Sequence, residues 1–152
     1  MSGPIRPTGL RRIEMHDVRD ALALHAFVAE LMALFQGDIP RPNPLMDEDI
    51  DATLVELSLM RDDFYDTFAL HVAREYLAGR MDFYWADKAM NSLFAWSDFD
   101  LADGTFAWDV FVAFDEGEYD HSADPEGTDP EIKYTRPYLR EAFEQFGIEL
   151  PT

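Results

Sequence analysis

Apolar side chains recur at intervals of three and four residues over the first part of the chain, which is the spacing of one helix face. Asp17 suits the N-cap of such a helix, and Gly37 suits its end. The positions expected on its buried face are Val18, Ala21, Leu22, His25, Val28, Leu31, Met32 and Phe35. Three prolines between residues 39 and 44 prevent the helix from continuing, so we expect a stiff loop there.

Three further helices are expected, over 47–60, 64–76 and 82–96. Acidic residues open the first of them, where they face the positive end of the helix dipole. We expect Asp62 and Asp63 to break or cap the chain before the next helix, which Gly79 ends. The inward side chains are expected to be Ile50, Leu54, Leu57 and Met60, then Phe64, Phe68, His71, Val72 and Tyr76, and then Phe83, Ala86, Met90, Leu93 and Phe94.

The segment 105–116 fits two patterns. Its alternate positions are apolar, as in a strand, and so is one helical face. The alternating positions are Phe106, Trp108, Val110, Val112 and Phe114, and the helical face consists of Ala107, Val110, Phe111 and Phe114. The helical segments on either side favour a helix here, and a strand is the alternative.

The segment 117–130 contains two glycines, two prolines and five acidic residues, so it is expected to be an exposed loop. Thr135 is the expected N-cap of a last helix, with Pro137 in its first turn and Gly147 at its end. Its buried face would consist of Tyr138, Leu139, Ala142, Phe143 and Phe146. These patterns together predict an all-α fold of about six helices, with one compact domain over 16–152 after a flexible N-terminal arm over 1–15.

Composition narrows the class of protein. Hydrophobic residues make up 47% of the 152 positions, which is enough for a packed core, and there is no cysteine for disulfides, thiolate metal sites or thiol catalysis. The N-terminus has no apolar run of signal-peptide length, and no segment has the 18 or more apolar residues of a membrane span. We therefore expect a soluble, cytoplasmic protein that does not bind membranes.

Charge is distributed very unevenly. The 44 residues between Lys88 and Lys133 contain no Lys or Arg, but they contain twelve acidic and eight aromatic residues, so they carry −12 of the formal net charge of −19. A disordered acidic tail would be poor in aromatic residues. The charge would repel nucleic acid and attract basic proteins, so we expect a basic protein partner. The alternative is that the acidity only keeps the protein soluble.

Motifs for catalysis, cofactors or metals are absent. The sequence has no HExxH, no P-loop, no glycine-rich dinucleotide motif and no serine in a nucleophile elbow. His71 and Glu75 have helical metal-ligand spacing, and Glu118 and His121 form a Glu-x-x-His pair inside the expected loop. We expect His25 and His71 to be partly buried and hydrogen-bonded, and His121 to be a solvated loop residue. The sequence thus predicts no enzyme, no cofactor and no metal site.

The candidate binding site is the acidic end of the segment around residue 116. If 105–116 is a helix, acidic residues crowd its C-terminus, where the negative end of the dipole disfavours them. Residues that oppose local stability are often retained for function. The expected partner-binding residues are Asp115, Glu116, Glu118, Tyr119, Asp120 and Asp124. The alternative is a solvated acidic loop whose tyrosines pack on the core.

The runs Phe111–Tyr119 and Tyr134–Pro137, in a small, cysteine-free, acidic helical chain, resemble the immunity proteins with which bacteria neutralise polymorphic or contact-dependent toxins. The resemblance implies a tight inhibitor that blocks the basic active site of a toxin or enzyme domain. Two alternatives are a nucleic-acid mimic that blocks a DNA- or RNA-binding protein, and a small metal-dependent enzyme that uses His71 and nearby acids. The oligomeric state is left open.

Overall fold

The computed structural model describes residues 24–30, 33 and 61–151 of the chain. These residues contain five labelled helical elements and no β-strand, and 24–30 and 33 are helical as well. The elements are α3 (Arg61–Leu77), α4 (Phe83–Trp96), α5 (Phe106–Glu116), η2 (Glu131–Thr135) and α6 (Arg136–Gln145). The all-α fold class is confirmed. The expected arm over 1–15, the ends of the first helix, the loop over 39–44 and the helix over 47–60 lie outside the described residues.

Helix α3 differs from expectation at its start and agrees with it at its end. Asp62 and Asp63 lie in its first turn, so the prediction that they break or cap the chain is wrong. The positive end of the helix dipole explains why two acids are tolerated there. At the other end Gly79 has a φ of 80°, and the N–H of Arg80 donates to the carbonyl of Glu75, as in a Schellman motif.

Helix α4 matches its prediction closely. Asp82 accepts a hydrogen bond from the backbone N–H of Trp85 at 2.9 Å and so caps the helix. The predicted inward residues Ala86, Met90 and Leu93 are fully buried. Their spacing of four and three residues places them on one face, which packs against α3 and α5.

The segment 105–116 forms helix α5 (Phe106–Glu116), so the helix prediction is confirmed and the strand alternative is wrong. Thr105 caps the helix by accepting a hydrogen bond from the N–H of Trp108 at 3.2 Å. A second acceptor comes from α3, because the buried Asp66 accepts from the N–H of Ala107 at 2.8 Å. Two side chains therefore satisfy free N–H groups at the start of α5, which a strand would not present in this way.

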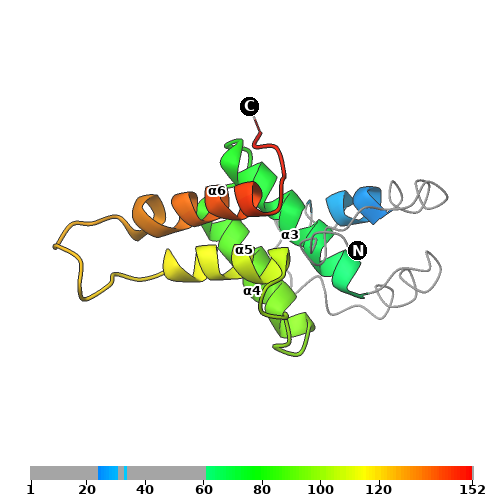
Figure 1. Ribbon diagram of the computed structural model, residues 1–152, viewed down its shortest axis with the longest axis horizontal. Helices are drawn as coiled ribbons and strands as arrows, with labels where there is room; N and C mark the ends of the chain where they lie inside the picture. The colour runs from blue at the N-terminus through cyan, green and yellow to red at the C-terminus, as the bar shows by residue number, and fades with distance from the viewer. Residues whose placement is uncertain (1–23, 31–32, 34–60, 152) are drawn as a thin grey trace, which may run out of the picture.

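Helix α5 lies at the centre of the fold, since it packs against α3, α4, η2 and α6. Figure 1 shows α5 and α6 running antiparallel beside one another, with the connection between them projecting beyond the ends of both helices. The largest fully buried side chains come from several elements: Val28, Phe64, Phe68, Met90, Leu93, Phe106, Phe114, Leu139 and Phe143. Each such side chain contributes about 1.5–3 kcal/mol by leaving water.

The last helix, α6, begins at Arg136, with Thr135 at the N-cap position and Pro137 in the first turn, as predicted. Residues 131–135 form a π-turn, in which the N–H of Arg136 bonds the carbonyl of Glu131, and α6 follows without a break. Pro137 has no N–H to donate and its ring crowds the preceding turn, which favours this wider turn. The Thr135 side chain makes no capping hydrogen bond to α6, although a cap was predicted. Its hydroxyl instead donates to the carbonyl of Ala113 at 2.7 Å. The predicted end at Gly147 is confirmed by its φ of 69°.

Candidate functional site

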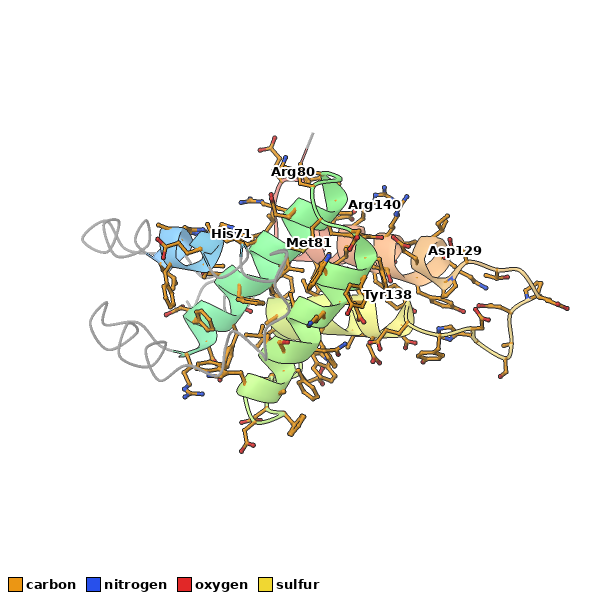
Figure 2. All side chains as sticks on the ribbon, turned by 180° about the vertical axis from the view of Figure 1, so that it is seen from behind. His71, Arg80, Met81, Asp129, Tyr138 and Arg140 are labelled. Carbon is orange, nitrogen blue, oxygen red and sulfur yellow. The ribbon has the colours of Figure 1, made fainter. Side chains whose placement is uncertain are left out.

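The acidic loop, residues 115–131, includes the last two residues of α5, the connection 117–130 and the first residue of η2. It contains eight acidic residues and no Lys or Arg. Figure 2 shows Asp129 in this region, at the opposite end of the described structure from His71. Contacts with α3, α4, α5 and η2 determine the conformation of the loop.

Three rings form a stack across the loop. The rings of Tyr119 and His121 have centroids 4.5 Å apart, and those of His121 and Tyr134 have centroids 4.0 Å apart, with interplanar angles of 23° and 28°. Nε2 of His121 donates to the carbonyl of Glu116 at 2.8 Å, and the hydroxyl of Tyr119 donates to the Glu116 carboxylate at 2.8 Å. The His121 side chain is only 19% exposed, so the prediction of a solvated residue is wrong. The two phenol rings cover the imidazole.

Asp124 fastens the middle of the loop to η2. Its carboxylate accepts hydrogen bonds from the Lys133 ammonium and from the Tyr134 hydroxyl, the latter at 2.6 Å. These hydrogen bonds hold the pKa of Asp124 below its usual value. The Asp124 side chain is 8% exposed, so in the free protein this carboxylate organises the loop.

A carboxylate cluster, Asp87, Asp115 and Glu118, lies where α4 meets the start of the loop. Asn91 donates from its amide to Asp87 at 3.3 Å and to Glu118 at 3.4 Å. Burial, and then the hydrogen bond and charge of Glu118 and the charge of Asp115, raise the pKa of Asp87 to about 8. Burial and the neighbouring Glu118 and Glu116 also raise the pKa of Asp115. The cluster therefore holds more negative charge than its surroundings favour.

The end of the loop is tied to α3. Glu131 accepts a short hydrogen bond from the Tyr76 hydroxyl, and Nη2 of Arg136 lies 3.8 Å from the same carboxylate. Burial, and then this hydrogen bond, raise the pKa of Tyr76 to about 12, so the phenol stays protonated and acts as a donor. The negative charge of Glu131 is thus offset by the Tyr76 hydroxyl and the Arg136 guanidinium of the same chain.

The six predicted binding residues divide into two groups. Asp115, Glu118 and Asp120 are exposed, and Tyr119 is 50% exposed. Glu116 and Asp124 make hydrogen bonds within the chain that shape the loop. That any of the six contacts a partner stays a prediction.

Sequence reasoning missed Asp87, Lys133 and the role of His121. Asp87 and Asn91 are four residues apart on one helix face, which is a signal for a local pair. Nothing in the sequence indicates that Glu118 joins this pair, because that contact depends on how α4 and α5 pack. Lys133 follows the 44-residue segment that lacks Lys and Arg, and among Lys and Arg residues it is the nearest along the chain to Asp124.

His25 and His71 contact each other through their ring nitrogens. Nδ1 of His25 lies 2.9 Å from Nε2 of His71, so one imidazole donates to the other, as expected for partly buried, hydrogen-bonded side chains. Burial, and then the charges of His25 and Arg74, lower the pKa of His71 to about 4. Glu75 instead pairs with Arg80 at 2.6 Å. Within the described residues, no group of three or more His, Asp or Glu side chains could hold a metal ion.

Comparisons with known proteins yield no relative. No protein-family model matches the chain, and neither do any curated protein or any solved structure. In the part of the chain that the structure describes, no helix is both long enough and apolar enough to cross a membrane.

Proposed function

We propose that this protein binds a basic protein partner through the exposed face of the acidic loop. The observation that carries the proposal is a group of three exposed carboxylates, Asp115, Glu118 and Asp120, beside the half-exposed ring of Tyr119. None of the three carboxylates has a Lys or Arg ion-pair partner among the described residues. An aromatic ring among unpaired charges is typical of an interface centre.

The cost of ionising carboxyl groups at the start of the unbound loop favours the binding of a cationic group. Burial, and then the neighbouring carboxylates, raise the pKa values of Asp87 and Asp115, so ionising either group costs free energy. A Lys or Arg side chain placed beside Asp115 and Glu118 would lower that cost. Long-range attraction from the whole acidic segment would also raise the association rate.

The loop is held in shape before any partner arrives. The ring stack, the Asp124 anchor and the Tyr76–Glu131 hydrogen bond each fix a different part of it. A loop that is already ordered loses less conformational entropy on binding than a flexible one. This arrangement suits a tight binder better than a segment that is acidic only for solubility.

The resemblance to immunity proteins suggests the class of partner. A toxin or enzyme domain that acts on phosphate-bearing substrates has a basic active site, and a carboxylate surface competes for its Lys and Arg side chains. We propose that the chain is a cytoplasmic inhibitor that blocks such a site and neutralises the toxin.

Affinity capture from cells that naturally express the chain tests this proposal. The loop variant carries Asp115→Lys, Glu118→Lys and Asp120→Lys, and the control variant carries Asp62→Lys, Asp100→Lys and Glu149→Lys. Both change the net charge equally, and all six side chains are exposed. We expect the native chain and the control variant to retain one basic protein in stoichiometric amount, and the loop variant to lose it. Equal retention by both variants, or retention of no basic protein, would contradict the proposal.

A further inference from the structure

A small pocket with a volume of about 230 Å³ lies between helices α5 and α6. Its lining residues are Trp108, Asp109, Val112, Tyr138, Glu141, Ala142 and Gln145. Typical small-molecule sites have volumes of about 300–1,000 Å³, so this pocket has the size for one side chain rather than for a larger ligand. It lies outside the acidic loop.

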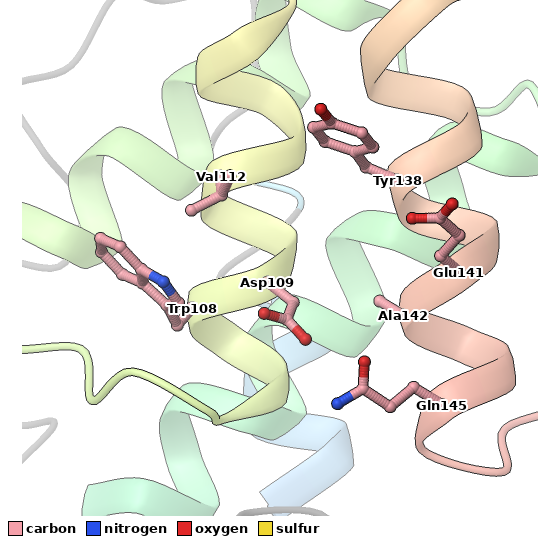
Figure 3. A pocket seen from close by; sticks show the side chains of 7 residues that line it. All are labelled: Trp108, Asp109, Val112, Tyr138, Glu141, Ala142 and Gln145. Carbon is pink, nitrogen blue, oxygen red and sulfur yellow. The ribbon is translucent and has the colours of Figure 1, made fainter.

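The polar groups of the pocket converge from both helices. Figure 3 shows Asp109 reaching from α5, and Glu141 and Gln145 reaching from α6, into the space between the helices. None of the lining residues is Lys or Arg. Within the described part of the chain, no side-chain hydrogen bond or ion pair engages these three polar groups, so their acceptor atoms are available to a ligand.

Burial makes the Asp109 carboxylate costly to ionise. Burial, and then the charge of Asp103, raise the pKa of Asp109. No cation of the described residues offsets this effect. A positive group in the pocket would stabilise the ionised form of both Asp109 and Glu141.

The aromatic walls point to the same kind of ligand. The chain has three tryptophans. Arg61 lies over the ring of Trp96 at 4.3 Å, and Lys88 lies near the ring of Trp85 at 5.1 Å. Among the described residues, no cation covers Trp108, the third tryptophan. The Trp108 ring packs beside Phe111 with centroids 5.6 Å apart, and it lines the pocket together with Tyr138, so a cation in the pocket would lie near both rings.

We infer that the pocket between α5 and α6 binds an arginine side chain of the protein partner, held by Asp109, Glu141 and Gln145 against the rings of Trp108 and Tyr138. A guanidinium group fits better than an ammonium group for two reasons. Its five N–H donors match carboxylates on two walls and an amide oxygen, and its flat face stacks on an aromatic ring. The source of the arginine rests on the proposed function, whereas the chemistry of the pocket does not.

The pocket itself is tested by NMR titration with N-acetyl-arginine methylamide. Its neutral isostere N-acetyl-citrulline methylamide serves as the control ligand, and N-acetyl-lysine methylamide tests the preference for guanidinium. We expect saturable shifts of the Trp108 indole and Gln145 amide resonances with the arginine probe, weaker shifts with lysine, and none with citrulline. The Asp109→Asn/Glu141→Gln variant should bind the arginine probe at least about tenfold more weakly, because two charge-assisted hydrogen bonds are lost. Equal shifts with citrulline, or no saturable shift, would overturn the inference.

Variants separate the pocket from the acidic loop. The loop variant should bind the arginine probe as the native chain does, since none of its changes lines the pocket. The Asp109→Asn/Glu141→Gln variant should retain less of the partner in affinity capture, and thermal melts should show that it is folded. Undiminished capture by this variant would overturn the assignment to a partner's arginine. Capture that is lost with the loop variant alone would leave the proposed function intact.

Discussion

At the scale of single residues, Asp87 shows most clearly that the fold makes a carboxylate costly to ionise. It lies in α4, faces Glu118 and Asp115 across the start of the acidic loop, and has a pKa raised to about 8. One of its carboxylate oxygens, Oδ1, is buried and has no hydrogen-bond partner in the structure. Protonation of Asp87 therefore favours the folded state, because the neutral carboxyl avoids the repulsion of its neighbours.

This raised pKa predicts a stability that falls with pH. Between the ordinary pKa of 3.8 and the folded value of about 8, the unfolded chain has released a proton that the folded chain retains. The contribution of Asp87 is therefore complete below about pH 4 and is lost as the pH rises towards 8. Asp87→Asn should leave stability unchanged near pH 4 and raise it at pH 8 by on the order of 1 kcal/mol, after allowance for solvent screening.

Urea denaturation from pH 4 to pH 8 measures this difference. Asp62→Asn, which changes an exposed acid of α3, is the matched control for the loss of one carboxyl group. If the free energy of unfolding had the same pH dependence in the native chain and in Asp87→Asn, the pKa of Asp87 would not be raised in the folded state.

Gly117 is required by a close approach of two segments. A Cβ at this position would lie 2.0 Å from Oγ1 of Thr135 and 3.0 Å from a ring carbon of Phe83. Gly117→Ala should therefore lower the free energy of unfolding by about 1–3 kcal/mol, because Thr135 must give up its hydrogen bond to Ala113 or η2 must shift.

A double-mutant cycle in thermal or urea unfolding checks the cause. Thr135→Ala removes the atom that clashes, so Gly117→Ala should cost clearly less in the Thr135→Ala background than in the native chain. Additive effects of the two changes would mean that the alanine is destabilising for another reason.

At the scale of elements, the ends of helices at glycine were the features that local sequence predicted best. Gly79 and Gly147 act within a few residues of themselves, so the turns that they form follow from neighbouring positions. The start of the last helix was predicted correctly, but the role of the Thr135 side chain was not, because its hydroxyl turns towards α5 instead of capping α6. That contact spans 22 residues and depends on packing, which the local pattern does not contain.

Helix α5 has one cap from its own sequence and one from α3. Asp66→Ala should lower the free energy of unfolding by about 1.5–3 kcal/mol, because it removes a buried acceptor from the N–H of Ala107. Thr105→Ala removes only the local cap and should cost about 1 kcal/mol. Chemical denaturation of the two variants measures both values. An Asp66→Ala effect no larger than that of Thr105→Ala would contradict the role of α3 in capping α5.

The acidic loop should loosen when its anchor is removed. Asp124→Ala eliminates the contacts to Lys133 and Tyr134, so amide hydrogen exchange in residues 118–128 should become faster while exchange in α5 changes little. Glu126→Ala changes an exposed acid of the same loop and is the control. Equal exchange rates in the two variants would show that Asp124 does not order the loop.

At the scale of the whole molecule, the sequence located the acidic surface but not its organisation. The absence of Lys and Arg over 44 residues was visible directly, and it placed the exposed carboxylates near residue 116. The ring stack, the carboxylate cluster and the α5–α6 pocket were not visible. Each combines side chains that only tertiary packing brings together. These are Tyr119 with Tyr134 in the ring stack, Asp87 with Glu118 in the carboxylate cluster, and Asp109 with Glu141 in the pocket.

The proposed attraction of the acidic loop for a basic protein partner can be followed in the rate of association. Stopped-flow mixing of the chain with its captured partner measures this rate. The rate should fall by about tenfold or more between about 20 mM and about 200 mM salt, because screening removes long-range attraction. The loop variant should associate slowly at both salt concentrations, while the control variant, with the same net charge, should keep most of the native rate at low salt. Equal association rates for the loop and control variants, or a native rate that is independent of salt, would contradict the proposed attraction.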